Sequence, residues 1–194
     1  MIKHPITTIL LTVGLAANAP ALEIGDEIVD THVKMQSIDD ATLTLSELKG
    51  PKGTLVIFTC STCPFVLNWQ KTMVEIGNTY SKKGIGVIFI NSNDPDQNGD
   101  TFESMKTMAR EEGYQFPYLV DSTSDVARSF GATKTPDVFL FDANDKLVYK
   151  GAVGEGGHTV GEKIWLKDAL DALLNGEKIE NPVTKTVGCG IKFR

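Results

Sequence analysis

The sequence is poor in cysteine, histidine and aromatic residues, and these shortages exclude several classes of protein. Its 194 residues include three cysteines and three histidines, and 8% of them are aromatic. Three cysteines are too few for the disulfide framework of a small secreted domain. No Cys and His spacing matches a zinc site. We therefore expect a fold built on an ordinary hydrophobic core, with no metal site and no cofactor.

The sequence also lacks an excess of positive charge. Nineteen Lys and Arg stand against 25 Asp and Glu, so the formal net charge is −6. Binding to nucleic acid requires clustered basic side chains that neutralise phosphates. We therefore expect no nucleic-acid partner.

Only the N-terminus carries a long apolar run. A short positive start precedes apolar residues 6–17, and small residues follow over 17–21. This order is typical of a secretory signal peptide. Cleavage after Ala19 or after Ala21 fits, and we favour Ala21 because the other frame places Pro20 directly after the cut. An uncleaved anchor is the alternative, although a membrane span needs about 20 apolar residues.

The sequence thus predicts a signal peptide over 1–21 and one domain over 22–194. We expect the mature protein to be periplasmic or secreted, with no membrane contact after cleavage. Thiols outside the cytosol tend to oxidise, so the three cysteines are candidates for redox chemistry.

The rest of the chain alternates between strand and helix patterns. Buried or edge strands are expected over 42–45, 54–59, 85–90, 118–120, 138–141 and 147–149, and helices over 64–80, 101–113, 122–130 and 162–174. A short helical turn over 46–48 and a polar loop over 91–100 lie between them, and the C-terminal tail has no clear periodicity. Such alternation predicts an α/β fold, with helices on both faces of a sheet and three parallel strands between 54 and 120.

The strongest chemical signal is Cys60-Ser61-Thr62-Cys63, at the junction of a buried strand and a long helix. A helix N-terminus stabilises a thiolate through its dipole and its free N–H groups. Pro64 suits the first helical position, which makes Cys63 the N-cap residue. A helix that starts at Ser61 is the alternative, and it would give the favoured place to Cys60.

Five segments together resemble a known family: 58–66 (FTCSTCPFV), 90–94 (INSND), 113–119 (GYQFPYL), 135–142 (TPDVFLFD) and 188–193 (GCGIKF). They are similar to the thioredoxin-like redoxins of the alkyl hydroperoxide reductase/thiol-specific antioxidant group, in their peroxiredoxin-like branch. The resemblance runs from about residue 24 to residue 194.

This resemblance implies a thioredoxin-like fold with a central mixed sheet and helices on both faces. It also implies that Pro136 is cis and faces the cysteines, and that Thr135 offers backbone hydrogen bonds to a substrate. Cys63 takes the attacking position. Cys189 would be either a resolving thiol or an inert, partly buried one.

The chain departs from related patterns at several positions. Strand 54–59 contains no acidic residue, which thioredoxins use to move protons. Lys134 stands where many members of this branch have cysteine, either near the thiolate or as a solvated lysine. The peroxiredoxin pattern of Pro and Thr before the reactive cysteine is replaced by Val56 and Cys60.

We therefore expect an exported thiol–disulfide oxidoreductase. Cys63 would attack a protein or small-molecule disulfide, and Cys60, or else Cys189, would resolve the mixed disulfide. Thr135 and Pro136 would hold the substrate, and an external thiol reductant would restore the dithiol.

The sequence leaves three alternatives, two functions and one metal site. The first is a peroxiredoxin-like thiol peroxidase. The second is a copper-binding chaperone similar to the Sco type, with Cys60, Cys63 and His158 as ligands. The third is a calcium loop that opens at Asp94, although its closing position is Met105 rather than glutamate.

Overall fold

The computed structural model describes residues 21–157 and 159–194. The signal-peptide prediction falls on residues that are almost all outside this range, and His158 also lies outside it. Within the described part of the chain, no helix has the length and apolar character that a membrane span requires.

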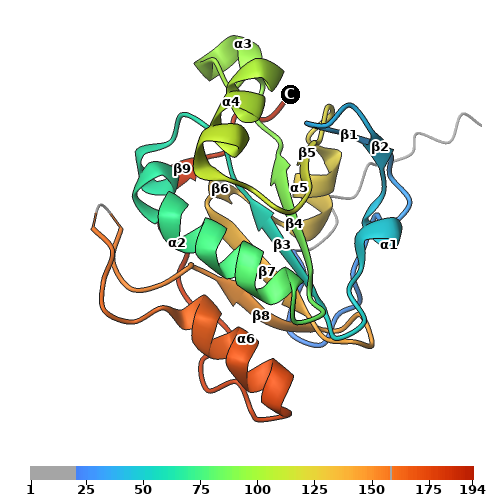
Figure 1. The fold of residues 1–194 in the computed structure, drawn as a ribbon, viewed down its shortest axis with the longest axis vertical. Helices are drawn as coiled ribbons and strands as arrows, with labels where there is room; N and C mark the ends of the chain where they lie inside the picture. The colour runs from blue at the N-terminus through green and yellow to red at the C-terminus, as the bar shows by residue number, and fades with distance from the viewer. Residues whose placement is uncertain (1–20, 158) are drawn as a thin grey trace, which may run out of the picture.

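A seven-stranded mixed sheet forms the centre of the molecule (Figure 1). Its strands are β1 (Met35–Ser37), β2 (Thr42–Leu43), β3 (Thr54–Phe58), β4 (Gly86–Asn91), β5 (Tyr118–Val120), β7 (Asp137–Phe141) and β8 (Leu147–Gly151). They lie in the order β2-β1-β5-β4-β3-β7-β8. A separate pair joins β6 (Lys134–Thr135) to β9 (Cys189–Gly190).

The central strand β3 fixes the position of the redox motif. All five of its residues are buried, as its run of apolar and β-branched side chains predicts. It pairs in parallel with β4 and antiparallel with β7. Because β4 also pairs in parallel with β5, the predicted set of three parallel strands is confirmed.

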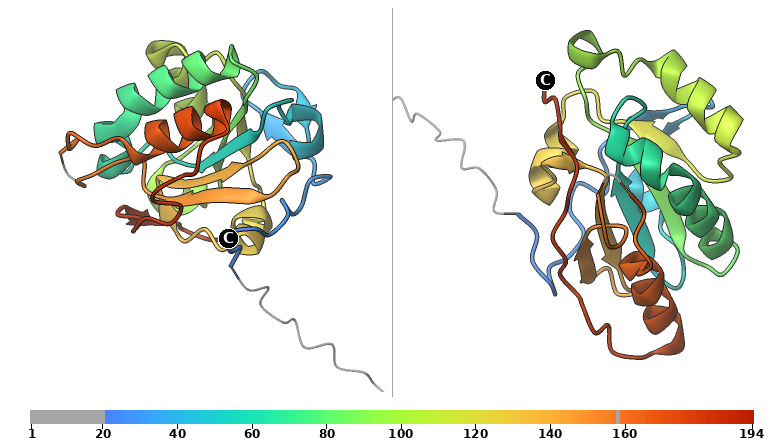
Figure 2. Two further views of the ribbon diagram at one scale, coloured as in Figure 1. Left: turned by 90° about the horizontal axis from the view of Figure 1, so that it is seen from below. Right: turned by 90° about the vertical axis from the view of Figure 1, so that its left-hand side faces the viewer.

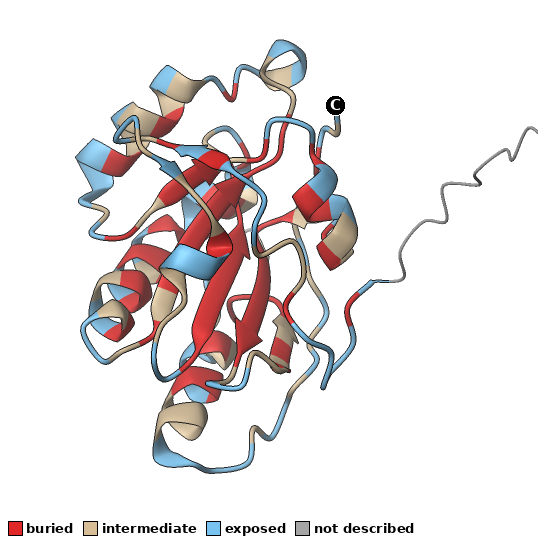
Figure 3. Ribbon diagram, turned by 90° about the vertical axis from the view of Figure 1, so that its right-hand side faces the viewer, coloured by how far each residue is buried: buried red, intermediate tan, exposed pale blue. Residues whose placement is uncertain are grey.

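Helices cover both faces of the sheet, as predicted (Figure 2). The helices are α1 (Leu45–Leu48), α2 (Pro64–Ser81), α3 (Pro95–Asn98), α4 (Phe102–Glu112), α5 (Asp125–Phe130) and α6 (Trp165–Asn175). One hydrophobic core contains side chains from α2, α4 and α6, and a second contains side chains from α1 and α5. Figure 3 shows the buried strands between these layers.

Several predicted boundaries were wrong, and side-chain caps explain part of the difference. The strand expected over 42–45 ends at Leu43, because Thr44 caps α1 through a capping box with Glu47. The helices expected from 122 and 162 each begin three residues later, at Asp125 and Trp165.

Four elements were missed by the sequence patterns. β1, β6 and β9 have only two or three residues each, too few for a periodic signal. The expected polar loop 91–100 contains the short helix α3, and four of its polar residues are buried: Asn91, Ser92, Asn93 and Asp100.

Candidate redox site

The redox motif lies where β3 ends and α2 begins. Cys63 is the N-cap residue of α2, with extended backbone angles, and Pro64 occupies the first turn. The prediction that the helix starts after Cys63 is confirmed, and the alternative start at Ser61 is wrong. Cys63 therefore faces the positive end of an 18-residue helix, where a thiolate is stabilised.

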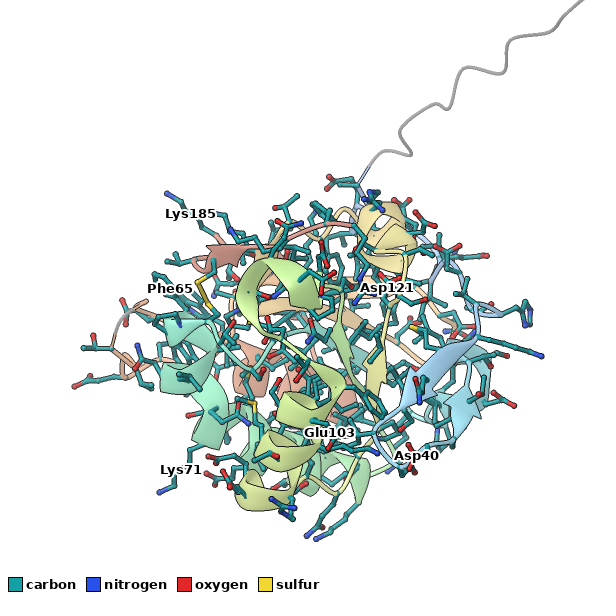
Figure 4. The ribbon with its side chains drawn as sticks, turned by 90° about the horizontal axis from the view of Figure 1, so that it is seen from above. Asp40, Phe65, Lys71, Glu103, Asp121 and Lys185 are labelled. Carbon is teal, nitrogen blue, oxygen red and sulfur yellow. A yellow bond between two sulfur atoms is a disulfide. The ribbon has the colours of Figure 1, made fainter. Side chains whose placement is uncertain are left out.

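The structure joins Cys63 to Cys189 in a disulfide across 126 residues of sequence, with the two Cα atoms 6.1 Å apart. Figure 4 shows a disulfide beside Phe65, in the first turn of α2. The Cys63 side is 3% exposed, whereas Cys189 is partly exposed. Of the two partners considered for Cys63, it is thus Cys189 that the structure bonds to it.

Cys60 is a free thiol, and it is 1% exposed. Its Sγ lies 3.2 Å from the hydroxyl oxygen of Thr135. Burial raises the pKa of the Cys60 thiol, and the nearby Asp100 carboxylate raises it further. Hydrogen bonds from Thr135 and from the backbone of Cys63 oppose this shift only in part. Cys60 is therefore a protonated thiol at neutral pH.

Thr135 connects the three cysteines. Its carbonyl oxygen lies 3.4 Å from Cys63 Sγ, its hydroxyl contacts Cys60, and its backbone pairs with Cys189 in the β6–β9 ladder. The Thr135–Pro136 peptide bond is cis, as the family resemblance implied. Sequence reasoning had no means to find the pairing of Thr135 with the tail, because a two-residue strand leaves no pattern.

The tail that carries Cys189 is attached to the domain on both sides of the disulfide. Before Cys189, the Thr186 hydroxyl donates to Asp137 Oδ1 at 2.8 Å, and the Lys134 ammonium donates to the Thr186 carbonyl at 3.3 Å. After it, the Ile191 N–H donates to the Thr133 carbonyl at 2.9 Å. Lys134, which sequence reasoning placed near the thiolate or in solvent, thus holds the tail.

Asp137, directly after Pro136, is a further titratable group that sequence reasoning missed. Burial raises its pKa to about 6, although the Thr186 hydroxyl and two backbone N–H groups stabilise the charged form. Its carboxylate faces the tail on the side of β7 where that strand begins.

Asp100 was missed for a different reason. It closes a polar run in which Asp94, Asp96 and Asn98 match a calcium pattern, and no local pattern distinguishes Asp100 from these residues. In the structure Asp94 instead caps α3 by accepting the Asp96 N–H, and Asn98 donates to Asp100 at 2.9 Å. Asp100 also accepts hydrogen bonds from the loop between Cys60 and Cys63.

No group of three or more His, Cys, Asp or Glu residues within 21–157 and 159–194 is arranged to hold a metal ion. The calcium alternative has no cluster there to support it. The copper alternative requires His158, which lies outside the described residues, so it stays a prediction.

Comparison with known proteins identifies the family. The model of the AhpC/TSA family matches residues 24–150. Thiol-disulfide oxidoreductase ResA of Bacillus cereus is 22% identical over 135 residues, which make up 70% of this chain and 73% of ResA.

Solved structures agree with this fold. An uncharacterized conserved protein from Geobacillus kaustophilus is 34% identical, with a TM-score of 0.83, over 89% of this chain and 93% of that protein. A secreted Mycobacterium tuberculosis disulfide oxidoreductase, homologous to DsbE of E. coli, is 11% identical with a TM-score of 0.58, over 74% and 97% of the two chains. The thioredoxin-like fold expected from the sequence is thus confirmed. This chain belongs to the AhpC/TSA family and is an oxidoreductase with a thioredoxin-like fold.

Proposed function

We propose that the protein is a thiol–disulfide oxidoreductase whose working disulfide joins Cys63 to Cys189. The observation that carries this proposal is the bond between a cysteine at a helix N-terminus and a cysteine on a tail that the domain holds in place. The similarity to ResA, named for this activity, supports the reaction class. Cys60, as a buried and protonated thiol, stays reduced in this scheme.

Oxidation of the dithiol reduces the substrate. The Cys63 thiolate attacks one sulfur of a substrate disulfide, forms a mixed disulfide and releases the other sulfur as a thiolate. Cys189 then attacks Cys63 Sγ, which frees the second substrate thiolate and leaves the Cys63–Cys189 bond. Two electrons pass from the protein to the substrate.

An external thiol reductant closes the cycle, and the exposure of the two sulfurs suggests where it attacks. In the disulfide-bonded form Cys63 is nearly inaccessible and Cys189 is partly exposed, so the incoming thiolate bonds to Cys189. Cys63 then leaves as a thiolate at the N-terminus of α2, where the helix dipole stabilises it. A second thiol releases Cys189 and completes the reduction.

Thr135 and Pro136 are proposed to position the substrate. Thr135 has its carbonyl oxygen beside Cys63 Sγ and its hydroxyl beside Cys60 Sγ. The substrate class is a protein or small-molecule disulfide.

We also propose that the protein is exported, with residues 1–21 as a signal peptide and residues 22–194 as the mature domain. A periplasmic or secreted location would keep Cys189 in an oxidising environment. The M. tuberculosis neighbour described as secreted supports this location.

A thiol peroxidase is the second candidate, because a resolving cysteine distant in sequence also suits this chemistry. Hydrogen peroxide would oxidise Cys63 to a sulfenic acid with release of water. Cys189 would then displace a second water and form the same disulfide.

The test uses single turnovers of reduced protein with a small aromatic disulfide, in parallel with hydrogen peroxide. Thiol counting and Trp69 fluorescence follow the reaction. Cys63→Ser should lose the reaction, Cys189→Ser should stop at a mixed disulfide on Cys63, and Cys60→Ser should react as the native protein does. The proposal fails if Cys60→Ser, and not Cys189→Ser, blocks disulfide closure. Peroxide that reacts much faster than the disulfide would establish the peroxidase instead.

A further inference from the structure

A buried carboxylate lies behind the loop between Cys60 and Cys63. Asp100 is 3% exposed, and its Oδ1 accepts the Ser61 N–H at 2.7 Å and the Ser61 hydroxyl at 2.6 Å. Its Oδ2 accepts the Thr62 hydroxyl at 3.2 Å. Both residues between the two cysteines are therefore fixed to one side chain on a different segment.

The same carboxylate reaches the C-terminal tail through Asn93. The Asn93 side-chain amide donates to Asp100 Oδ2 at 2.6 Å, and its Oδ1 accepts the Lys192 N–H at 2.8 Å. The Lys192 carbonyl in turn accepts the Asp94 N–H at 2.7 Å. Lys192 lies three residues after Cys189, so Asp100 and Asn93 join the two segments that carry the reactive cysteines.

We propose that Asp100 and Asn93 are positioning residues that hold the Cys60–Cys63 loop in register with the tail, so that Cys63 forms its disulfide with Cys189 rather than with Cys60. This inference rests on the proposed function, in which Cys63–Cys189 is the working disulfide. We call these two residues the polar bridge.

Competition between the two possible partners gives the polar bridge its importance. Cys60 is three residues from Cys63 and can reach it at little entropic cost, whereas Cys189 is 126 residues away and is near Cys63 only while the tail is docked. With Ser61 and Thr62 held by Asp100, Cys60 Sγ stays beside the Thr135 hydroxyl. The polar bridge thus holds Cys60 away from Cys63 and keeps Cys189 close to it.

The variant Asp100→Asn breaks the bridge with almost no change in volume. An asparagine presents one acceptor and one NH₂ donor where aspartate presents two acceptors. In either orientation an NH₂ group would face donors, since Ser61 donates to one oxygen and the amides of Asn93 and Asn98 donate to the other. The loop or the tail must then give up its hydrogen bonds.

The experiment equilibrates native and variant proteins with mixtures of reduced and oxidised glutathione, and then maps disulfides by mass spectrometry after an acid quench. Each protein disulfide formed converts one oxidised glutathione into two reduced ones. The native protein should form Cys63–Cys189 with Cys60 free. In Asp100→Asn the equilibrium constant for Cys63–Cys189 should fall about tenfold, as for the loss of one or two buried hydrogen bonds, and Cys60–Cys63 should appear.

The matched control is Asp121→Asn. Asp121 is 2% exposed and accepts the Ser92 hydroxyl and the Ala127 N–H, so its side chain is as deeply buried but bonds neither the cysteine loop nor the tail. It should keep the native connectivity and equilibrium constant. If Asp100 had a merely structural role, Asp100→Asn and Asp121→Asn would show the same disulfide connectivity and the same equilibrium constant.

The double variant Ser61→Ala/Thr62→Val provides a second test if Asp100→Asn does not fold. It removes two of the hydroxyl bonds to Asp100 at partly exposed and exposed positions, and it should shift the disulfides in the same direction. Native connectivity and an unchanged equilibrium constant in whichever of these variants folds would overturn the inference. A Cys60–Cys63 bond in the native protein would instead overturn the proposed function.

Discussion

Cys60 and Cys63 are separated by two residues, yet the fold gives their sulfur atoms different surroundings. Cys63 caps an 18-residue helix and bonds to the tail. Cys60 is buried against the Thr135 hydroxyl, and its pKa is raised by burial and by the Asp100 carboxylate. The sequence predicts that this pair carries the chemistry and that Cys63 is the N-cap, because a proline at the first helical position is a local signal. Asp100, which adds to the effect of burial on the pKa of Cys60, is distant in sequence and carries no such signal.

Asp137 yields a prediction for pH-dependent stability. Burial raises its pKa from the ordinary 3.8 to about 6, so the folded protein binds more protons than the unfolded chain between these values. The free energy of unfolding therefore falls as pH rises from about 4 to about 6. Above this window the free-energy penalty of the ionised Asp137 carboxylate stays constant. Asp137→Asn removes the penalty, and it should stabilise the protein at pH 7 by about 2–3 kcal/mol.

Urea unfolding of both proteins at several pH values checks this. The difference between Asp137→Asn and the native protein should vanish near pH 4, where the native carboxyl is neutral. A difference of the same size at pH 4 and pH 7 would contradict the assignment of a buried, titrating carboxyl at this position.

At the scale of secondary structure elements, the short ladder between β6 and β9 brings Cys189 to Cys63. Thr135 pairs with Cys189 and Lys134 with Gly190. Gly188, just before the strand, passes so close to Thr135 that a Cβ would lie 2.2 Å from its carbonyl oxygen. The chain needs glycine at this position because the backbone of Gly188 lies against the backbone of Thr135. Neither segment can move apart without displacing the disulfide.

Gly188→Ala should therefore displace Cys189 and slow closure of the disulfide about tenfold or more, since small misplacements of reacting atoms have effects of this size. The rate of Cys63–Cys189 formation after mixing with a small disulfide measures it. Gly190→Ala is the control, because a Cβ at Gly190 meets no atom within 4 Å. Equal rates for the two variants would show that the β6–β9 ladder does not position Cys189.

The elements that the sequence predicts well are those with long, regular patterns. The buried run of β3 and the apolar face of α2, with Trp69, Met73 and Tyr80 buried, specify themselves locally. The elements that the sequence does not reveal are set by tertiary pairing. β9 is defined by its pairing with β6, and the buried Asn93 accepts a hydrogen bond from the Lys192 N–H of the tail.

At the scale of the whole molecule, the Cys63–Cys189 bond closes the chain from α2 to β9 into one loop, and β1, β2, α1 and β3 lie outside it. The tail runs along the length of the molecule to reach this point (Figure 2). The bond links the N-cap of α2 to strand β9, over a separation of 126 residues. A long closed loop restricts the unfolded chain more than a short one, so the redox state is coupled to the stability of the whole domain.

Reduction should lower the free energy of unfolding by about 2–4 kcal/mol, the typical contribution of a disulfide. Urea unfolding with and without a thiol reductant measures this difference. Cys60→Ser should show the same drop, whereas Cys189→Ser should unfold alike in both conditions. A reductant-dependent drop that persists in Cys189→Ser would mean that a different disulfide closes in solution.

The most direct test of the central claim is to identify the first disulfide formed. Reduced native protein is mixed with one equivalent of a small disulfide, quenched with acid and an alkylating reagent within a fraction of the reaction time, and mapped by mass spectrometry. We predict that Cys63 and Cys189 become bonded while Cys60 carries the alkyl label. A Cys60–Cys63 bond at the earliest time would contradict this account, because the tail cysteine would then take no part in the primary reaction.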